Sequence, residues 1–309
     1  SGSVAGNSSS YLRSLTGYTT SFYAAYAEFR GLGSAIGAGR SGLSLEGAGA
    51  AGSISSSTIR DGYRALELSG SSGIRVFWNK LFNHADVGLR LAGAGGAHQL
   101  RWNLVMANDN IGIALRGTQD YNTLADNLVF GNGNHGLSIG TLGNTISRGR
   151  AFANALDGFI VSGGQNQVSE LRSYDNMGAG ITVTGSSNTI SGSVVEGSTA
   201  VVVSGSTGTI IERSRLESLS GSGLWVRNGS VNLTLRLSAV SASTAAVFID
   251  HGNTGLITIA SNTIERGAWY GVYAATQAYG AALWISSNTI LTTLSTALAY
   301  SGREPARWM

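Results

Sequence analysis

A short pattern, one small residue followed by alternating apolar residues, recurs through most of this chain at a nearly constant spacing. It opens as Gly42-Leu43-Ser44-Leu45 and closes as Ala297-Leu298-Ala299-Tyr300. The small residues stand at positions 42, 65, 88, 112, 136, 158, 180, 200, 223, 246, 271 and 297, which are 20 to 26 residues apart. Self-similarity at such a period is the signature of a solenoid, in which each repeat stacks on the next and buries a continuous core.

Columns of equivalent residues indicate what each repeat contains. Nine positions before the small residue, asparagine recurs at Asn79, Asn103, Asn127, Asn262 and Asn288. A polar turn closer to the small residue carries Asn83, Asn108, Asn132, Asn154 and Asn176. Equivalent residues of stacked strands lie about 4.8 Å apart, so the buried amides of one column can donate to one another as a ladder. We therefore expect coils of three short parallel strands with asparagine ladders at the turns.

This combination of asparagine turns and small-apolar-x-apolar strands resembles the parallel β-helix repeat of the pectate-lyase-like superfamily. The resemblance covers roughly residues 40–300. It implies an all-β fold, a right-handed parallel β-helix of about 12 coils. The superfamily includes lyases, hydrolases, epimerases, phage tailspikes and surface adhesins, so the resemblance implies a fold and leaves the function open.

The two ends of the chain depart from the repeat. We expect an N-terminal segment and cap over residues 1–39, the β-helix over 40–300 and a C-terminal tail over 301–309. Residues 11–31 are rich in aromatic side chains, among them Tyr18 and Tyr23. The spacing of Phe22, Tyr26 and Phe29 fits one face of a short amphipathic helix, which would cover the open end of the core.

Stacking also predicts which outward side chains are neighbours. Trp78 and Trp102 occupy equivalent positions one coil apart. If their indoles are exposed, they form a platform for the apolar faces of sugars, and we name them as carbohydrate-binding candidates. The competing interpretation is a partly buried pair packed by a flanking loop. Another column, with Phe82, Met106, Phe130, Phe152 and Tyr174, predicts an aromatic ladder lining a bend in the core.

The same outward column continues with charged residues on consecutive coils. Asp126 and Glu170 are two coils apart, near the separation of the two carboxyl groups in an inverting glycosidase. Arg148 lies between them and would lower the pKa of a general acid, so an exposed salt ladder is the favoured interpretation. Arg150 and Arg172 stand beside this column, one coil apart, and could neutralise a uronate. These five residues are the weak catalytic candidates.

The central residue of the repeated apolar strand faces outward and changes character along the chain. It is polar at first, then becomes apolar and aromatic at Ile160, Val202, Trp225, Phe248 and Tyr273. A contiguous apolar stripe on a solvent face marks an interaction surface. We therefore predict an interface along this stripe, either with a second copy of the chain or with a C-terminal segment of the same chain folded back onto it.

The low share of charged residues argues against some classes of partner. Charged residues make up 12% of the chain, and no cluster of Lys and Arg occurs, so we expect no nucleic-acid partner. No apolar run reaches the roughly 18 residues that a membrane span needs. Glycine-rich calcium repeats and paired-Asp hydrolase motifs are absent from the sequence. We expect neither a metal nor another cofactor. The absence of these motifs favours a non-catalytic protein over an enzyme.

Three functions fit these observations. The favoured hypothesis is an extracellular, cell-surface or virion β-helix that acts as a non-catalytic fibre, adhesin or tailspike-like module. It would contact polysaccharide, a cell-surface glycan or other subunits of a homo-oligomer. The first alternative is a polysaccharide lyase or glycoside hydrolase that works in a groove along the helix. The second is a self-assembling filament or surface-layer subunit.

Overall fold

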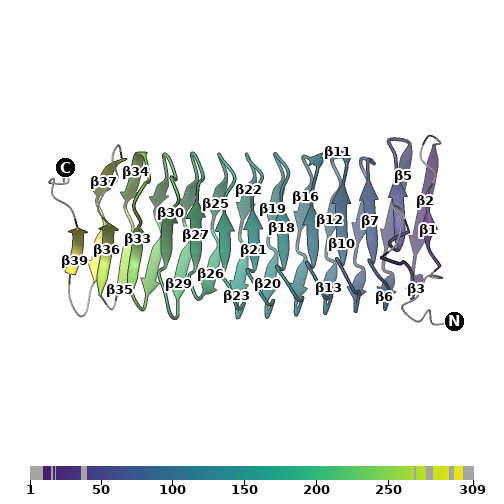
Figure 1. Cartoon of the computed structure of the whole chain (residues 1–309), viewed down its shortest axis with the longest axis horizontal. Helices are drawn as coiled ribbons and strands as arrows, with labels where there is room; N and C mark the ends of the chain where they lie inside the picture. The colour runs from purple at the N-terminus through teal and green to yellow at the C-terminus, as the bar shows by residue number, and fades with distance from the viewer. Residues whose placement is uncertain are drawn as a thin grey trace. The chain divides into compact units, whose positions relative to one another are not determined.

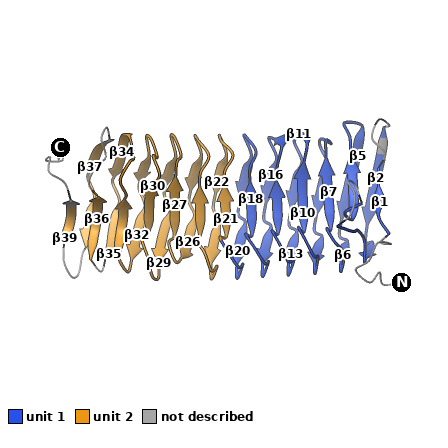
Figure 2. Cartoon of the chain, in the orientation of Figure 1, with its two compact units in different colours: residues 1–156 blue, residues 157–309 orange. Residues whose placement is uncertain are grey.

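The computed structural model describes residues 10–14, 17, 19–35, 40–267, 269–275, 281–291 and 296–301. Throughout this described part the chain forms strands and turns, with no helix. The chain divides into two compact units, residues 1–156 and 157–309 (Figure 2). Within each unit, three strands per coil stack on their equivalents in the next coil (Figure 1).

Unit 1 contains three parallel sheets, which we call the corner, middle and closing sheets in the order in which each coil visits them. Its corner sheet is β1 Leu12–Arg13, β4 Leu43–Glu46, β7 Leu66–Ser69, β10 Leu89–Ala92, β14 Ile113–Leu115 and β18 Leu137–Ile139. Its middle sheet is β2 Thr20–Ala25, β5 Ala50–Ser55, β8 Arg75–Phe77, β12 Gln99–Arg101, β16 Thr123–Ala125 and β19 Thr145–Ser147. Its closing sheet is β3 Glu28–Arg30, β6 Thr58–Arg60, β9 Lys80–Phe82, β13 Leu104–Met106, β17 Leu128–Phe130 and β20 Arg150–Phe152. A separate pair is β11 Ala94–Gly96 and β15 Thr118–Asp120.

Unit 2 repeats the same arrangement. Its corner sheet is β21 Phe159–Val161, β24 Ile181–Val183, β27 Val201–Ser204, β30 Leu224–Arg227, β33 Ala245–Ile249, β36 Tyr270–Ala275 and β39 Thr296–Ser301. Its middle sheet is β22 Gln167–Ser169, β25 Thr189–Ser191, β28 Ile210–Glu212, β31 Thr234–Arg236, β34 Gly255–Ala260 and β37 Ala281–Ser286. Its closing sheet is β23 Arg172–Tyr174, β26 Val194–Gly197, β29 Arg215–Ser218, β32 Ala239–Ala242, β35 Thr263–Gly267 and β38 Thr289–Leu291.

The predicted right-handed parallel β-helix is confirmed, and the predicted number of about 12 coils is roughly right. Its register follows the repeated pattern: Leu43 pairs with Leu66, and Leu66 pairs with Leu89. In unit 2, Val201 pairs with Leu224 in the same way. In the corner strands from β4 to β36, the apolar residues that flank the central position point inward and are buried. Each fully buried Leu or Ile side chain contributes about 1.5–3 kcal/mol to folding relative to an exposed one.

The predicted asparagine ladder forms. Asn79 Nδ2 donates to Asn103 Oδ1 over 3.0 Å, and Asn103 Nδ2 donates to Asn127 Oδ1 over 3.0 Å. A second segment of this column joins Asn262 to Asn288 at the same distance. Each amide also donates to a backbone carbonyl, so buried polar groups at the turn are paired.

In the second predicted column, Asn83 does not belong to the ladder. Asn83 is exposed, and the buried His84 occupies the position equivalent to Asn108. The backbone N–H of His84 donates to Asn108 Oδ1, and Asn108 in turn donates to Asn132. A third column, not identified from the sequence, begins with His98, whose N–H donates to Asn122 Oδ1. Histidine therefore replaces asparagine in two ladders of unit 1.

The small residues at the corners are required for space. A Cβ atom on Gly112 would lie 2.4 Å from Val129 Cγ1 and 2.8 Å from the Asn132 amide nitrogen. Gly158 is equally crowded, with Ser173 Oγ 2.1 Å from its position for Cβ. The φ angle of neither glycine lies in the left-handed region. The glycine column thus lets the asparagine turn pack closely against the corner.

The N-terminal prediction of a helix is wrong. Residues 20–25 and 28–30 form strands β2 and β3, which pair with β5 and β6 of the following coil. Phe22 and Phe29 are half-buried on these strands, and Tyr26 is exposed at the turn between them. The alternation of aromatic and small residues that suggested a helical face is the alternation of a strand. Tyr18 and residues 302–309 lie outside the described residues.

The two ladder histidines predict sensitivity to acid. Burial lowers the pKa of both His84 and His98. In both rings Nδ1 accepts a backbone N–H, from Gly62 and Ile74 respectively, so protonation there would break a hydrogen bond. The unfolded chain then binds more protons than the folded one below the ordinary histidine pKa of about 6.5. The free energy of unfolding should therefore fall as pH drops below about 6.5, by up to about 1.4 kcal/mol per pH unit for each histidine.

The matched variants are His84→Asn and His98→Asn, which restore the residue that the ladders use elsewhere. Urea unfolding at pH 7 and pH 5 should show a smaller pH dependence in the double variant than in the unmodified protein. His251→Asn serves as the control because that ring is 75% exposed. An unchanged pH dependence in the double variant would exclude the ladder histidines as its source.

Candidate functional site

The outer face of the corner sheet forms a trough. In some coils the residue directly before the small corner residue packs against the central residue of a corner strand, as Tyr270 does against Tyr273. In unit 1 this brings Val87 and Ile111 into a small buried cluster with Ala114, on the side of the sheet away from the main core. The corner sheet therefore has side chains packed on both of its faces. Its outer face is concave, which is the shape that a ligand site requires.

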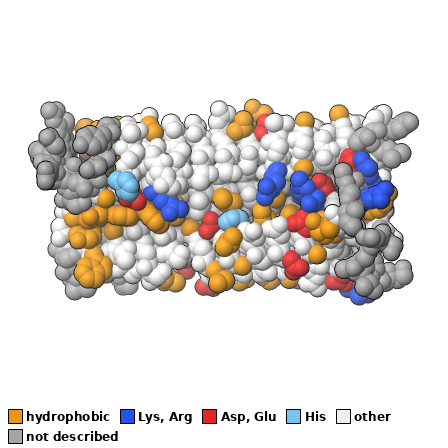
Figure 3. Space-filling view, viewed as in Figure 1, with side chains coloured by type: hydrophobic (Ala, Val, Ile, Leu, Met, Phe, Trp, Pro, Cys, Tyr) orange, Lys and Arg blue, Asp and Glu red, His pale blue; other side chains and the backbone are white. Residues whose placement is uncertain are grey.

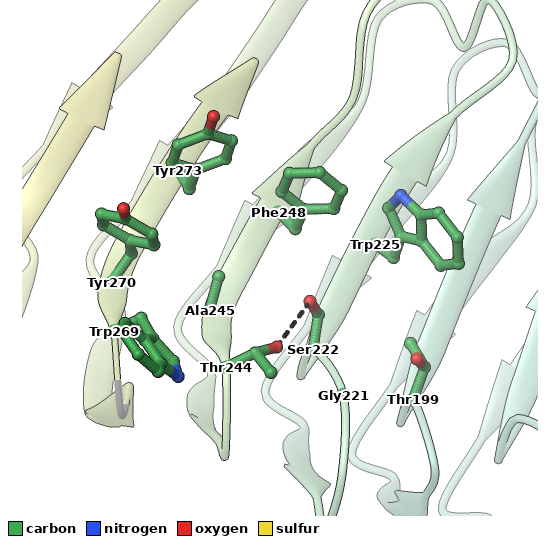
Figure 4. A pocket seen from close by; sticks show the side chains of 10 residues that line it. All are labelled: Thr199, Gly221, Ser222, Trp225, Thr244, Ala245, Phe248, Trp269, Tyr270 and Tyr273. Atoms are coloured by element: carbon green, nitrogen blue, oxygen red, sulfur yellow. Dashed lines mark hydrogen bonds between the residues drawn. The ribbon is translucent and has the colours of Figure 1, made fainter. Parts of the chain in front are cut away.

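In unit 2 the same trough is lined by aromatic rings and encloses a cleft of about 360 Å³. Trp225, Phe248 and Tyr273 project from the centres of β30, β33 and β36, and the register pairs them directly. The remaining lining residues are Thr199, Gly221, Ser222, Thr244, Ala245, Trp269 and Tyr270 (Figure 4). This volume lies at the small end of the range for ligand pockets, about 300–1,000 Å³.

The rings of the cleft are inclined to one another. Trp225 and Phe248 have centroids 6.0 Å apart at 39°, and Phe248 and Tyr273 are 5.4 Å apart at 25°. Tyr270 meets Tyr273 at 4.8 Å and 39°. Because these planes are not parallel, the rings leave wedge-shaped gaps and present part of their faces to the cleft. Figure 3 shows hydrophobic side chains gathered over these corner strands.

Polar side chains stand just beyond the lining of the cleft, at the ends of the corner strands, and we call this region the far rim. Arg227, two residues after Trp225, places its guanidinium carbon 4.3 Å from the centroid of the indole. Trp225 Nε1 and Arg227 Nε are shielded from solvent and have no hydrogen-bond partner among the described residues. On the next strand end, His251 Nδ1 lies 2.6 Å from Asp250 Oδ1. At the near rim, Ser222 Oγ and Thr244 Oγ1 are 3.5 Å apart, at the limit of a hydrogen bond.

The stripe predicted as an interface is continuous in the structure. Ile160 pairs with Thr182, which pairs with Val202, and Val202 pairs with Trp225. Most of these side chains are half-buried, but Val202 retains only 5% of its surface. The sequence did not identify Trp269 and Tyr270, which turn the stripe into a cleft. Their alignment directly before the corner residue Gly271 is the signal that would have found them.

Trp78 and Trp102 are exposed neighbours, at 55% and 42% of their surface, so the predicted pairing of their indoles is present. Their centroids are 4.8 Å apart and their planes differ by 4°. Phe77 packs edge-on against both rings. Since the two indoles stack face to face, each covers one face of the other, and fewer ring faces remain for a sugar than an open platform would offer. Both residues have positive φ, which is unusual for a bulky side chain.

The charged candidates form a salt bridge in unit 1. Arg148 Nε and Nη2 donate to the two oxygens of Asp126 over 2.8 and 2.9 Å. The hydrogen bond from Arg148 lowers the pKa of Asp126, which keeps that carboxylate ionised and unsuited to general-acid catalysis. Arg150 of unit 1 is exposed, and Glu170 and Arg172 are exposed in unit 2. The catalytic role of these five residues stays a prediction.

The Asp126–Arg148 pair should contribute little stability because Arg148 is 53% exposed. We expect Asp126→Asn, which also suits the positive φ at this position, to lower the free energy of unfolding by less than about 1 kcal/mol. Urea unfolding at low and high salt measures this difference. A loss above about 2 kcal/mol would contradict the assignment as a surface salt bridge.

The ladder predicted to line the core lies on the outside instead. Phe130 and Phe152 stack at 4.7 Å and 7°, as expected for one column. However, the first and third residues of β17 and β20 point outward, and the middle residue of each is buried. Phe82 and Met106 are half-buried in the same outer column. The bend in the core is filled by the middle residues, such as Val129.

A polar cleft of about 560 Å³ on unit 1 was also not identified from the sequence. Two buried carboxylates line it, Glu46 and Glu67. Arg13 pairs with Glu46 at 2.7 Å, and Arg64 pairs with Glu67 at 3.1 Å. Arg90 approaches Glu67 to 3.4 Å. These arginines neutralise the two carboxylates, and the resulting network of ion pairs along the cleft joins successive coils.

Among the described residues, no group of three or more His, Cys, Asp or Glu side chains is placed to hold a metal ion. Among the same residues no helix is long and apolar enough to cross a membrane.

The family is decided by comparison with known sequences. The model of the right-handed β-helix region matches residues 23–152 and 143–293, which together span most of the chain. The chain belongs to the right-handed β-helix family. No curated protein matches this right-handed β-helix in sequence.

Solved structures with the same fold are distant in sequence. The A-module of the Azotobacter vinelandii mannuronan C-5 epimerase AlgE4 superposes with a TM-score of 0.67 at 14% identity, over 92% of this chain and 90% of that one. The A-module of AlgE6 from the same organism gives 0.60 at 16%, over 93% and 91%. The Dettilon tailspike protein gives 0.56 at 12%, over 84% of this right-handed β-helix and 62% of the tailspike. At these identities the likeness establishes the fold alone.

Proposed function

We propose that this protein is a polysaccharide-binding β-helix that holds its glycan in the aromatic cleft of unit 2, without cleaving it. The observation that carries the proposal is the line of inclined rings from Trp225 through Phe248 to Tyr273. Sugar rings have apolar faces that pack on aromatic rings, and their hydroxyl groups suit the Ser222 and Thr244 side chains at the near rim. Successive strands repeat at about 4.8 Å, so the rings form a track suited to a polymer.

The chemistry of the lining favours binding over catalysis. The ten residues around the cleft supply rings, hydroxyl groups and small apolar groups, and none of them is Asp, Glu, His, Lys or Arg. Most glycoside hydrolases use two positioned carboxyl groups, and the lining contains none. A cluster of half-buried aromatic side chains instead provides binding energy, as aromatic anchors do at other interfaces.

The related structures support the class of ligand. The epimerase modules bear the name of mannuronan, a polysaccharide, and a tailspike is part of a virion. We accordingly propose an extracellular, cell-surface or virion location. The stripe that continues from the cleft toward Ile160 supports contact with a second copy of the chain, and we propose a homo-oligomer.

The test is a polysaccharide panel assayed in two ways. Immobilised polysaccharides of neutral, acetylated and acidic classes should retain the purified protein, at least one of them specifically. The same polysaccharides should release neither reducing ends nor ultraviolet-absorbing unsaturated products. Failure to retain the protein on any polysaccharide would overturn the proposal of binding, and product release would overturn the non-catalytic role.

A further inference from the structure

The aromatic cleft of unit 2 also carries information about which sugar it accepts. We infer that the cleft recognises an N-acetylated hexose within the polysaccharide, in preference to a uronic acid or an unsubstituted hexose. This inference rests on the proposed polysaccharide-binding function, and names the substituent that the cleft selects.

The apolar part of the lining argues for a methyl group on the ligand. Trp225, Phe248 and Tyr273 present partly exposed faces, and Ala245 lies on the same strand as Phe248, three residues before it (Figure 4). A methyl group seated among these rings leaves water and gains dispersion contacts. A carboxylate seated there would lose its hydration without a charged partner in the lining, which is costly.

The polar atoms at the far rim argue for a carbonyl beside that methyl group. Trp225 Nε1–H and Arg227 Nε–H are two unpaired donors on the same strand, and the guanidinium of Arg227 covers the indole. Leaving a buried donor without an acceptor is unfavourable. Arg227 is only half-buried, so its flexible side chain can move aside and expose the indole N–H to a ligand carbonyl.

The near rim supplies the complement to an amide N–H. Ser222 Oγ and Thr244 Oγ1 are separated by 3.5 Å, too far for a strong hydrogen bond, so each oxygen retains capacity to accept. An acetamido group combines a methyl, a carbonyl acceptor and an N–H donor in one plane. The cleft therefore offers a matching group for each part of that substituent, whereas a simple hydroxyl would use only the polar rims.

The experiment compares three tetrasaccharides by isothermal titration calorimetry: N-acetylglucosamine tetramer, cellotetraose, which lacks the acetamido group, and mannuronate tetramer. The unmodified protein should bind the acetylated tetramer at least about tenfold more tightly than either of the others, the equivalent of one well-made hydrogen bond. The variant Trp225→Phe keeps a ring but removes the indole N–H. In it, the preference for the acetylated tetramer over cellotetraose should fall about tenfold.

The matched control is Trp284→Phe, which removes an indole N–H on β37, outside the cleft, and should leave the preference unchanged. Equal or tighter binding of mannuronate, a preference that survives in Trp225→Phe, or no binding of any of the three tetramers would overturn the inference. If the protein is still retained by another polysaccharide of the panel, the proposed function stands while this inference fails. If no polysaccharide retains the protein, the proposed function itself has failed.

Discussion

Replacing Asn103 by alanine should lower the free energy of unfolding by about 3–5 kcal/mol. Asn103 is buried and takes part in four hydrogen bonds of its ladder. Its oxygen accepts from the backbone and side chain of Asn79, and its amide donates to Asn127 and to the carbonyl of Val76. Truncation removes all four side-chain hydrogen bonds and leaves the buried backbone N–H of Asn79 without its acceptor, while Asn127 Oδ1 keeps only the backbone N–H of residue 103. Urea unfolding followed by circular dichroism measures the loss.

The matched control is Asn110→Ala. Asn110 is a partly exposed residue of a neighbouring turn, and its amide donates to the Asp86 carboxylate over 2.8 Å. Because water can replace this partner, we expect a loss below about 1 kcal/mol. Equal losses in the two variants would mean that the ladder is not a principal source of stability.

The sequence predicted the fold because stacking makes equivalent residues neighbours. The alternation around Gly112 and the asparagines at positions 79, 103 and 127 predicted both the corner strands and the first ladder. That prediction depended on the same residue recurring at each ladder position. His84 and His98 occupy ladder positions with different side chains, so a search for repeated asparagine assigned Asn83 in place of His84.

The candidate site was predicted in part. The stripe through Trp225, Phe248 and Tyr273 follows from the spacing of the corner strands. The depth of the cleft does not follow from that spacing. It depends on how the preceding turn folds back and brings the ring centroid of Tyr270 to 4.8 Å from that of Tyr273. Contacts between columns of one coil are set by turn geometry, which the repeat period does not encode.

The first coil shows a related limit. Residues 20–30 contain several aromatic side chains whose spacing suits a helix face as well as a strand. Pairing of Leu12 with Leu43 and of Phe29 with Ile59 places them in the same three sheets as the later coils. The local sequence pattern is compatible with either a helix or a strand, and pairing with the following coil selects the strand.

Replacing Phe248 by alanine should weaken glycan binding about 30-fold or more. Phe248 is the central ring of the cleft, between Trp225 and Tyr273, and a central aromatic anchor typically contributes 2 kcal/mol or more to an interface. The side chain is half-buried on the outer face, so its loss leaves the main core of the β-helix intact. Calorimetry with a polysaccharide that retains the unmodified protein measures the change, and circular dichroism confirms the fold of the variant.

The most direct test of the proposed binding site is a comparison of dissociation constants for that polysaccharide between Phe248→Ala and Trp78→Ala. Both variants remove an aromatic ring from an outer surface, one in the cleft of unit 2 and the other in the stacked pair of unit 1. If the cleft holds the glycan, Phe248→Ala weakens binding about 30-fold or more and Trp78→Ala changes it by less than about threefold. Loss of binding in Trp78→Ala with unchanged affinity in Phe248→Ala would contradict this assignment and place the glycan on the Trp78–Trp102 pair.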